Sequence, residues 1–149
     1  MSLKERMTQD LRSAMRSHDT LRRDVLRMAQ NALQYGEIAK GAPLEEAEEV
    51  EALRRQVRQR KESIEAFEQA GRQDRADLEV SELAIIEEYL PAQKTREEVE
   101  ALARRAIADV GAQGAAHKGR VMGKLMPQLR GQADGDLVNA VVIELLEAG

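Results

Sequence analysis

The segment from His117 to Ala133 carries four basic side chains and no carboxylate. The rest of the chain is rich in acid, since the whole protein holds 27 acidic and 23 basic residues, so the segment is a local reversal of charge. Ammonium and guanidinium groups bind anionic oxygens through charge-assisted hydrogen bonds. The segment therefore predicts a cationic surface for an anionic partner. Its basic residues are Lys118, Arg120, Lys124 and Arg130.

The spacing of these residues suits one face of a short helix predicted from about His117 to Leu129. Arg120 and Lys124 are four positions apart and so share a helical face, with Lys118 within two turns of Lys124. Such a face could clamp a phosphate backbone, and the amides at the start of the helix would add donors. The alternative interpretation is an ordinary solvated face.

Two glycines and one asparagine bear on the same question. Gly119 and Gly123 would let a partner's backbone come close, or they would permit tight packing against a neighbouring helix. Asn139 could add one hydrogen bond to a phosphate. The sequence leaves both interpretations of the glycines open.

A second basic set lies in the middle of the chain, after a run of glutamates at 45–51. On a helix its members spread around the cylinder, so we expect solvated surface and ion pairing within the helix. An RNA-facing edge is the alternative. The only aromatic residues are Tyr35, Phe67 and Tyr89, which argues against stacking on single-stranded bases. The set comprises Arg54, Arg55, Arg58, Arg60 and Lys61.

Residue types for other chemistry are missing or badly spaced. There is no cysteine, which excludes disulfides, cysteine-based zinc sites and thiol nucleophiles. His18 and His117 are far apart and fit no metal-binding spacing. No serine lies in a nucleophile elbow, and Gly123-Lys124 is followed by leucine rather than the serine or threonine of a phosphate loop. We predict no catalytic residue, metal or cofactor.

Composition and patterning predict an all-α protein. Of the 149 residues 42% are hydrophobic and 34% charged, and the net charge is −4. No window alternates as a strand would, and no apolar run approaches the length needed to cross a membrane. The amino terminus lacks a signal-peptide pattern, so a cytoplasmic location without membrane partners is expected.

Helix signals divide the chain into two parts. Ser2 with Glu5 and Thr95 with Glu98 form predicted capping boxes. The second helix should fray near Gly36 to Gly41, and Pro43 should lie in the first turn of the third. Residues 91–94 form a predicted hinge. We expect an elongated helical hairpin or bundle over residues 1–91 and a compact three-helix module over residues 92–149.

Several short motifs, weak alone but in a consistent order, resemble the GatB/YqeY family. They are Arg23-x-x-Leu26-Arg27, Arg58-Gln59-Arg60-Lys61-Glu62-Ser63-Ile64-x-x-Phe67, Ala70-Gly71-Arg72-x-Asp74, Glu88-Tyr89-Leu90-Pro91, Gly119-x-Val121-Met122-Gly123 and Gly131-x-Ala133-Asp134-Gly135. The resemblance covers nearly the whole chain. It implies an amino-terminal helical part followed by a helical tail domain, like the tRNA-contacting tail of the GatB subunit of tRNA-dependent amidotransferase.

Three hypotheses about function follow from the residues and the resemblance. The first is a tRNA-binding accessory protein without a catalytic centre, with Lys118, Arg120, Lys124, Arg130 and Asn139 as its contacts. The second is a protein–protein adaptor for an aminoacyl-tRNA synthetase or amidotransferase, acting through the helical hairpin. The third is carbon–nitrogen ligase activity with glutamine as amido-N-donor, which the family label implies but no residue motif supports. The sequence does not determine the oligomeric state.

Overall fold

A computed structural model describes residues 1–148, and it confirms the all-α prediction. These residues form seven α-helices and one short 3-10 helix, with no strand among them. The chain divides into two compact units, Met1–Leu90 and the residues from Pro91 onward. Within residues 1–148, no helix has both the length and the apolar character to cross a bilayer.

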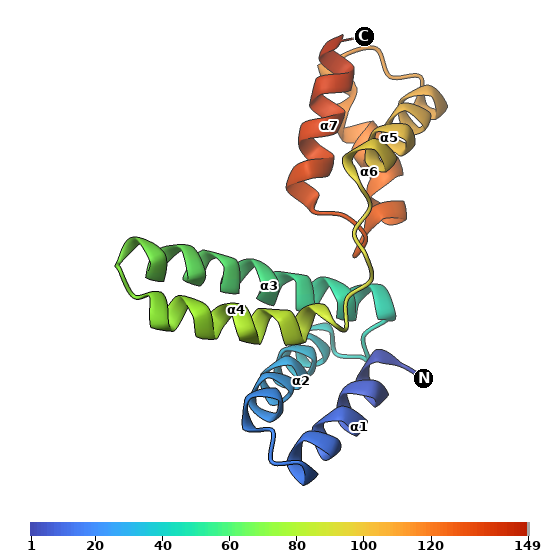
Figure 1. The fold of residues 1–149 in the computed structure, drawn as a ribbon. Coiled ribbons are helices and arrows are strands. Elements are labelled where there is room, and N and C mark those ends of the chain that lie inside the picture. Colours follow the sequence, from blue (N-terminus) through green and yellow to red (C-terminus); the bar gives the residue numbers. More distant parts are fainter. Residues whose placement is uncertain (149) are drawn as a thin grey trace. The chain divides into compact units, whose positions relative to one another are not determined.

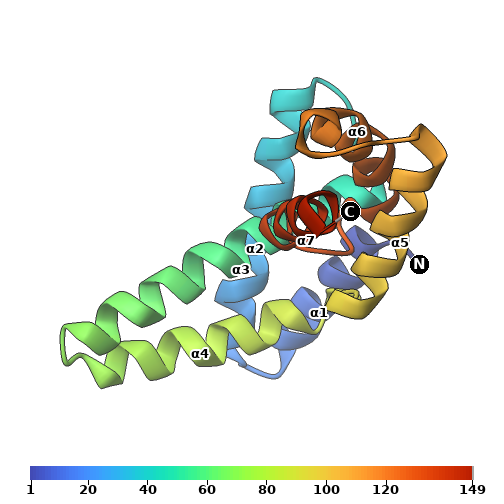
Figure 2. The ribbon, with the colours of Figure 1, turned by 90° about the horizontal axis from the view of Figure 1, so that it is seen from above.

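The first unit is built from two helical hairpins. Its helices are α1 (Leu3–Arg16), α2 (Thr20–Lys40), α3 (Glu46–Gln69) and α4 (Gln73–Glu87). Helix α1 pairs with α2, and α3 runs antiparallel beside α4 in both views (Figures 1 and 2). Helix α2 contacts α1, α3 and α4, so it is central to the unit. Apolar residues of all four helices share one core, including Met7, Leu26, Leu33, Leu53 and Ile86.

Local capping signals set several of the helix starts. The Ser2–Glu5 capping box is confirmed, with the Glu5 N–H donating to Ser2 Oγ at 3.1 Å. Asp19 caps α2, since its Oδ1 accepts from the Arg22 N–H at 3.1 Å. Each cap satisfies a backbone donor that the first helical turn leaves unpaired.

The region between α2 and α3 differs from the sequence prediction. Helix α2 runs through Gly36 and ends at Lys40 with Gly41 as its left-handed cap, at the far limit of the range from Gly36 to Gly41 in which it was expected to fray. Leu44 packs beside Gly36, and a Cβ added there would lie 3.0 Å from Leu44 Cδ1, so the leucine side chain would have to shift to admit it. Helix α3 begins only at Glu46, so Pro43 precedes the helix rather than lying in its first turn.

A polar network holds the end of α4 against α1 and α2. The Tyr89 hydroxyl donates to Asp10 Oδ2, and burial together with this hydrogen bond raises the pKa of Tyr89 above its ordinary value. Arg6 lies over the Tyr89 ring, 5.0 Å from its centroid. Arg22 Nη1 donates to Glu88 Oε2 at 2.6 Å. The network fixes the last residues of the first unit before the chain leaves it.

We expect Glu88→Gln to make the first unit less sensitive to acid. The hydrogen bond from Arg22 lowers the pKa of Glu88 from 4.5. A lowered folded-state pKa means that the pair stabilises the fold above the unfolded pKa, and that this contribution is lost as pH falls through the folded pKa. Because Glu88 is half exposed, the effect is a few tenths of a kcal/mol.

Thermal melts of both proteins from about pH 6 to about pH 3 measure this difference. The difference in stability should shrink as the pH falls. A difference that stays constant over that range would show that the Glu88 charge contributes nothing.

The second unit contains α5 (Arg96–Val110), the 3-10 helix η1 (Ala115–His117), α6 (Lys118–Leu129) and α7 (Gly135–Ala148). The predicted Thr95–Glu98 capping box opens α5 and is confirmed. The Lys94 N–H donates to the Gln132 carbonyl at 2.8 Å, which ties the end of the predicted hinge to this unit. The core draws on all three α-helices, including Val99, Val121, Leu125, Leu129, Val138 and Val141.

Candidate nucleic-acid interface

Helix α6 has one buried apolar face and one exposed face that is cationic and rich in glycine. Val121, Leu125 and Leu129 are completely buried in the core of the second unit. The opposite side carries exposed residues, which we call the α6 surface: Gly119, Arg120, Gly123 and Lys124. Because the buried face fixes the rotation of the helix, this surface must face solvent.

Arg120 and Lys124 come together on the α6 surface. They lie about 40° apart around the helix axis, and no carboxylate of residues 1–148 forms an ion pair with either. One amino group of Arg120 is already used within the fold, because its Nη2 donates to the Val110 carbonyl at 2.8 Å. This bond places a positive charge at the carboxyl end of α5, where the helix dipole favours it. The remaining N–H groups of Arg120 stay available.

The two glycines of the α6 surface have no packing role within the described part of the chain. A Cβ added at Gly119 or Gly123 would meet no heavy atom within 4 Å. The structure therefore gives no support to tight helix packing as the reason for these residues. Glycine inside a helix costs about 1 kcal/mol relative to alanine. Gly123 lies in the middle of α6, so the helix bears this cost there. The absence of a side chain leaves the backbone beside the two cations uncovered.

The other predicted contacts lie outside this surface. Lys118 is half buried, about one turn before Val121 and roughly 160° around the helix from Arg120. Arg130 follows the last turn of α6, roughly 15 Å along the axis from Arg120. Asn139 is half buried on α7. The structure thus brings Arg120 and Lys124 together and leaves the other three apart from them.

Sequence reasoning missed two exposed cations on α5. Arg104 and Arg105 are both exposed, and neither forms an ion pair within residues 1–148. The nearby carboxylates Glu100 and Glu144 both pair with Arg96. Arg105 lies about 140° around the helix from Glu100, so it faces away from that cluster. The signal in the sequence was an adjacent pair of arginines in an alanine-rich helix.

Only part of the second basic set forms the solvated surface that the sequence predicted. Arg54 and Arg60 are each only 7% exposed, and burial lowers the pKa of Arg54 below its ordinary value. Arg60 pairs with Glu79, at 3.1 Å, and with Glu82. Both partners belong to α4 rather than to the glutamates in the first turns of α3, so Arg60 pairs between helices. The exposed members of the set are Arg55, Arg58 and Lys61.

The histidines support local turns rather than a shared site. His117 Nδ1 accepts from the Gln113 N–H at 2.8 Å, which closes the turn before α6. His18 lies in the α1–α2 turn of the other unit. In the part of the chain that the structure describes, no three side chains of metal-ligating type gather to hold an ion.

Comparisons with known proteins agree with the motif order. The sequence model of the family described as Yqey-like protein matches residues 4–146. The chain is also 32% identical over 107 residues to a protein of Kluyveromyces lactis, the mitochondrial "altered inheritance of mitochondria protein 41". That stretch covers 70% of this chain but only 58% of the relative, so the chain spans less than two thirds of the relative's length. The family match extends across both units, and the chain therefore belongs to the YqeY family.

Proposed function

We propose that the second unit binds the phosphate backbone of tRNA through the α6 surface, and that the protein is a non-catalytic accessory to tRNA metabolism. One observation carries this proposal: within residues 1–148, Arg120 and Lys124 lack carboxylate partners and flank glycines that no packing explains. Exposed backbone beside two cations allows a phosphate strand to come close. The resemblance of this unit to the GatB tail favours tRNA among polyanions.

The chemistry of the unit favours recognition of backbone and shape. None of the three aromatic residues lies beyond Tyr89, so the second unit has no phenylalanine, tyrosine or tryptophan ring on which a base could stack. Duplex RNA is bound mainly through phosphates, 2′-hydroxyls and overall shape. With two phosphate contacts from α6, the slope of log affinity against log salt should be about −2, and steeper if Arg104 and Arg105 also engage.

Gly123→Ala tests whether bare backbone is needed for binding. Alanine should stabilise α6 by about 1 kcal/mol, which raises the melting temperature by a few degrees. The added methyl should hold an approaching phosphate strand away and weaken tRNA affinity by roughly fivefold, or about 1 kcal/mol. Thermal melting and a low-salt gel shift with unfractionated tRNA measure the two effects.

Gly135→Ala is the matched control. Gly135 opens α7, and a Cβ there also meets open space. This change should leave tRNA affinity unaltered. If Gly123→Ala also leaves the affinity unaltered, RNA binding does not need the bare backbone of the α6 surface.

A second candidate function is an adaptor that docks through α2. Met28, Tyr35 and Ile38 are 51%, 73% and 69% exposed, and their spacing places them along one side of the helix. Exposed apolar stripes of this kind mark protein contacts. The full chain with Tyr35→Ser and Ile38→Ser should lose binding to a purified aminoacyl-tRNA synthetase or amidotransferase and keep tRNA affinity. Wild-type protein that binds neither enzyme would refute the adaptor hypothesis.

We propose no amide-ligase reaction for this chain. The contacts of the α6 surface are positioned to hold an anion, and they include no nucleophile or general base. ATP-dependent turnover of glutamine by the purified protein would overturn this view. The cytoplasmic location stays a prediction, to be checked by fractionation of cells expressing the full-length protein.

A further inference from the structure

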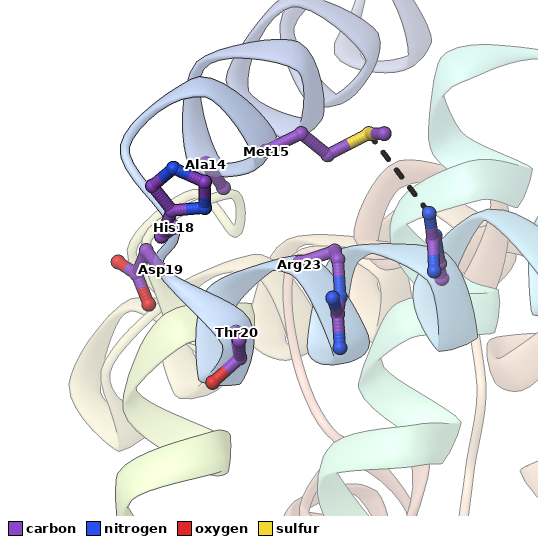
Figure 3. A pocket seen from close by; sticks show the side chains of 7 residues that line it. Ala14, Met15, His18, Asp19, Thr20 and Arg23 are labelled. Carbon is purple, nitrogen blue, oxygen red and sulfur yellow. Dashed lines mark hydrogen bonds between the residues drawn. The ribbon is translucent and has the colours of Figure 1, made fainter.

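A small pocket lies beside the turn between α1 and α2, in the first unit. Its volume is about 130 Å³, the space of roughly four water molecules. Ala14 and Met15 form the α1 side, His18 and Asp19 the turn, and Arg23 and Arg27 the α2 side. In Figure 3 the Met15 side chain extends from α1, and the dashed line at its sulfur is the hydrogen bond that Arg27 Nη2 donates at 3.9 Å. The pocket can hold a group the size of one tetrahedral oxyanion.

The backbone of the turn gives the pocket a defined shape. The Asp19 N–H donates to the Ala14 carbonyl at 2.9 Å, and the His18 N–H to the Met15 carbonyl at 3.4 Å. These two bonds form a Schellman motif, which ends α1 with His18 in the left-handed conformation at φ 58°. Histidine tolerates this conformation better than most side chains. The turn is therefore fixed by its own hydrogen bonds before any ligand arrives.

Two arginines line the pocket, and the charge of Arg27 is not neutralised within residues 1–148, whereas Arg23 forms an ion pair with Asp24. Arg27 Nη2 has one recorded partner within the described chain, the Met15 sulfur at 3.9 Å, and a thioether is a weak acceptor. Arg23 uses only its Nε to bond Asp24, at 2.9 Å, so its two terminal amino groups remain available. A guanidinium held against sulfur instead of a carboxylate keeps its full charge for an incoming anion.

The one carboxylate that lines the pocket is already engaged. Asp19 Oδ1 accepts the Arg22 N–H at 3.1 Å, and its Oδ2 lies 3.6 Å from Arg22 Nε. Arg22 does not line this pocket, so it offsets the Asp19 charge from outside. Two more cations stand on the neighbouring surface of α1: Arg12 and Arg16 are exposed, with no ion pair inside residues 1–148. Arg12 is three positions before Met15 and so is its neighbour on the helix.

We propose that this pocket binds one phosphate group, held by the guanidinium groups of Arg23 and Arg27. Two arginines one helical turn apart can each present a fork of N–H donors to phosphate oxygens. The site lies in the first unit and is independent of the α6 surface. The same residues form the Arg23-x-x-Leu26-Arg27 motif of the sequence, to which the proposed tRNA contact gives no role.

Nuclear magnetic resonance of the full chain tests the site directly. Inorganic phosphate is titrated into ¹⁵N-labelled protein, with chloride at matched ionic strength as the reference. The Nε–H signals of Arg23 and Arg27 and the amide signals of His18 to Thr20 should shift saturably with phosphate only. Arg27→Gln should weaken phosphate binding by roughly tenfold or more, as expected for loss of a charged hydrogen bond. Arg27 is exposed, so the variant should fold normally.

Arg58→Gln is the matched control, because Arg58 is an exposed arginine of α3 that does not line the pocket. It should bind phosphate like the wild type. Equal shifts with phosphate and chloride, or equal losses in the two variants, would overturn the proposal. A tRNA gel shift with Arg27→Gln then identifies the source of the phosphate. Once the titration has shown phosphate binding, reduced tRNA retention by this variant would mean that the bound phosphate belongs to the RNA backbone. Unchanged retention would mean that it belongs to a small phosphorylated molecule.

Discussion

Arg60→Ala is expected to lower the free energy of unfolding of the first unit by about 3 kcal/mol. The Arg60 side chain is 8% exposed and lies between Glu79 and Glu82 of α4. Alanine would leave the two carboxylates, which are 24% and 20% exposed, close together without a counter-charge. Because both retain some contact with water, we expect the lower end of the cost of breaking a buried ion pair. The melting temperature should fall by more than about 10 °C.

Two further variants separate charge from packing. Arg58→Ala, two positions before Arg60 on the exposed side of α3, should change stability by less than about 0.5 kcal/mol. Arg60→Met combined with Glu79→Gln and Glu82→Gln should recover most of the loss, because a whole buried ion cluster can be replaced at little cost. Urea titrations followed by circular dichroism measure all three. If the triple variant is as unstable as Arg60→Ala, the loss comes from packing of the arginine stem instead of its charge.

Arg120→Glu with Lys124→Glu is expected to lower tRNA affinity at low salt by at least about a hundredfold. The change removes two cations from the α6 surface and puts two carboxylates in their place, so attraction to phosphate becomes repulsion. The slope of log affinity against log salt should become shallower by about 2, which is the signature of lost phosphate contacts. Gel shifts at several salt concentrations give both quantities.

The structural bond of Arg120 requires its own control. Loss of the hydrogen bond to the Val110 carbonyl should cost about 1 kcal/mol, and a carboxylate at the end of α5 is disfavoured by the helix dipole. Lys124→Glu alone avoids both effects and should still weaken binding by about tenfold. Arg55→Glu with Arg58→Glu makes the same charge change on α3 of the first unit. Equal weakening by this pair would show that net charge, and not the α6 surface, governs binding.

The predictions that the structure bears out rest on interactions between near neighbours in the sequence. Ser2 with Glu5 and Thr95 with Glu98 form capping boxes because the partners are three residues apart. Arg120 and Lys124 share a face because they are four residues apart on a helix. The all-α class follows from apolar residues repeating at helical spacing along the chain. Such local patterns do not depend on contacts with distant segments of the chain.

What the sequence did not show depends on contacts between separate segments. Leu44 packs beside Gly36 of α2, and local helix propensity does not reveal that contact. Lys118 was grouped with Arg120 and Lys124, but it is half buried and lies on another side of α6. The placement of His18 beside Arg23 and Arg27 in one pocket likewise appears only in the folded backbone.

The helical class and the two capping boxes could be predicted from the sequence because they depend on residues within about one helical turn of each other, and the acid-free basic segment is visible directly in residues 117–133. The tertiary structure decided which charges are used inside the protein and which remain for a partner. Arg60 pairs with two glutamates 19 and 22 positions away, so its charge is neutralised within the first unit. Arg120, Lys124 and Arg27 find no carboxylate within the described residues, although Arg120 donates one hydrogen bond to a carbonyl 10 positions away. Neutralisation of a charge depends on distance in space, and only the packing of the helices sets that distance.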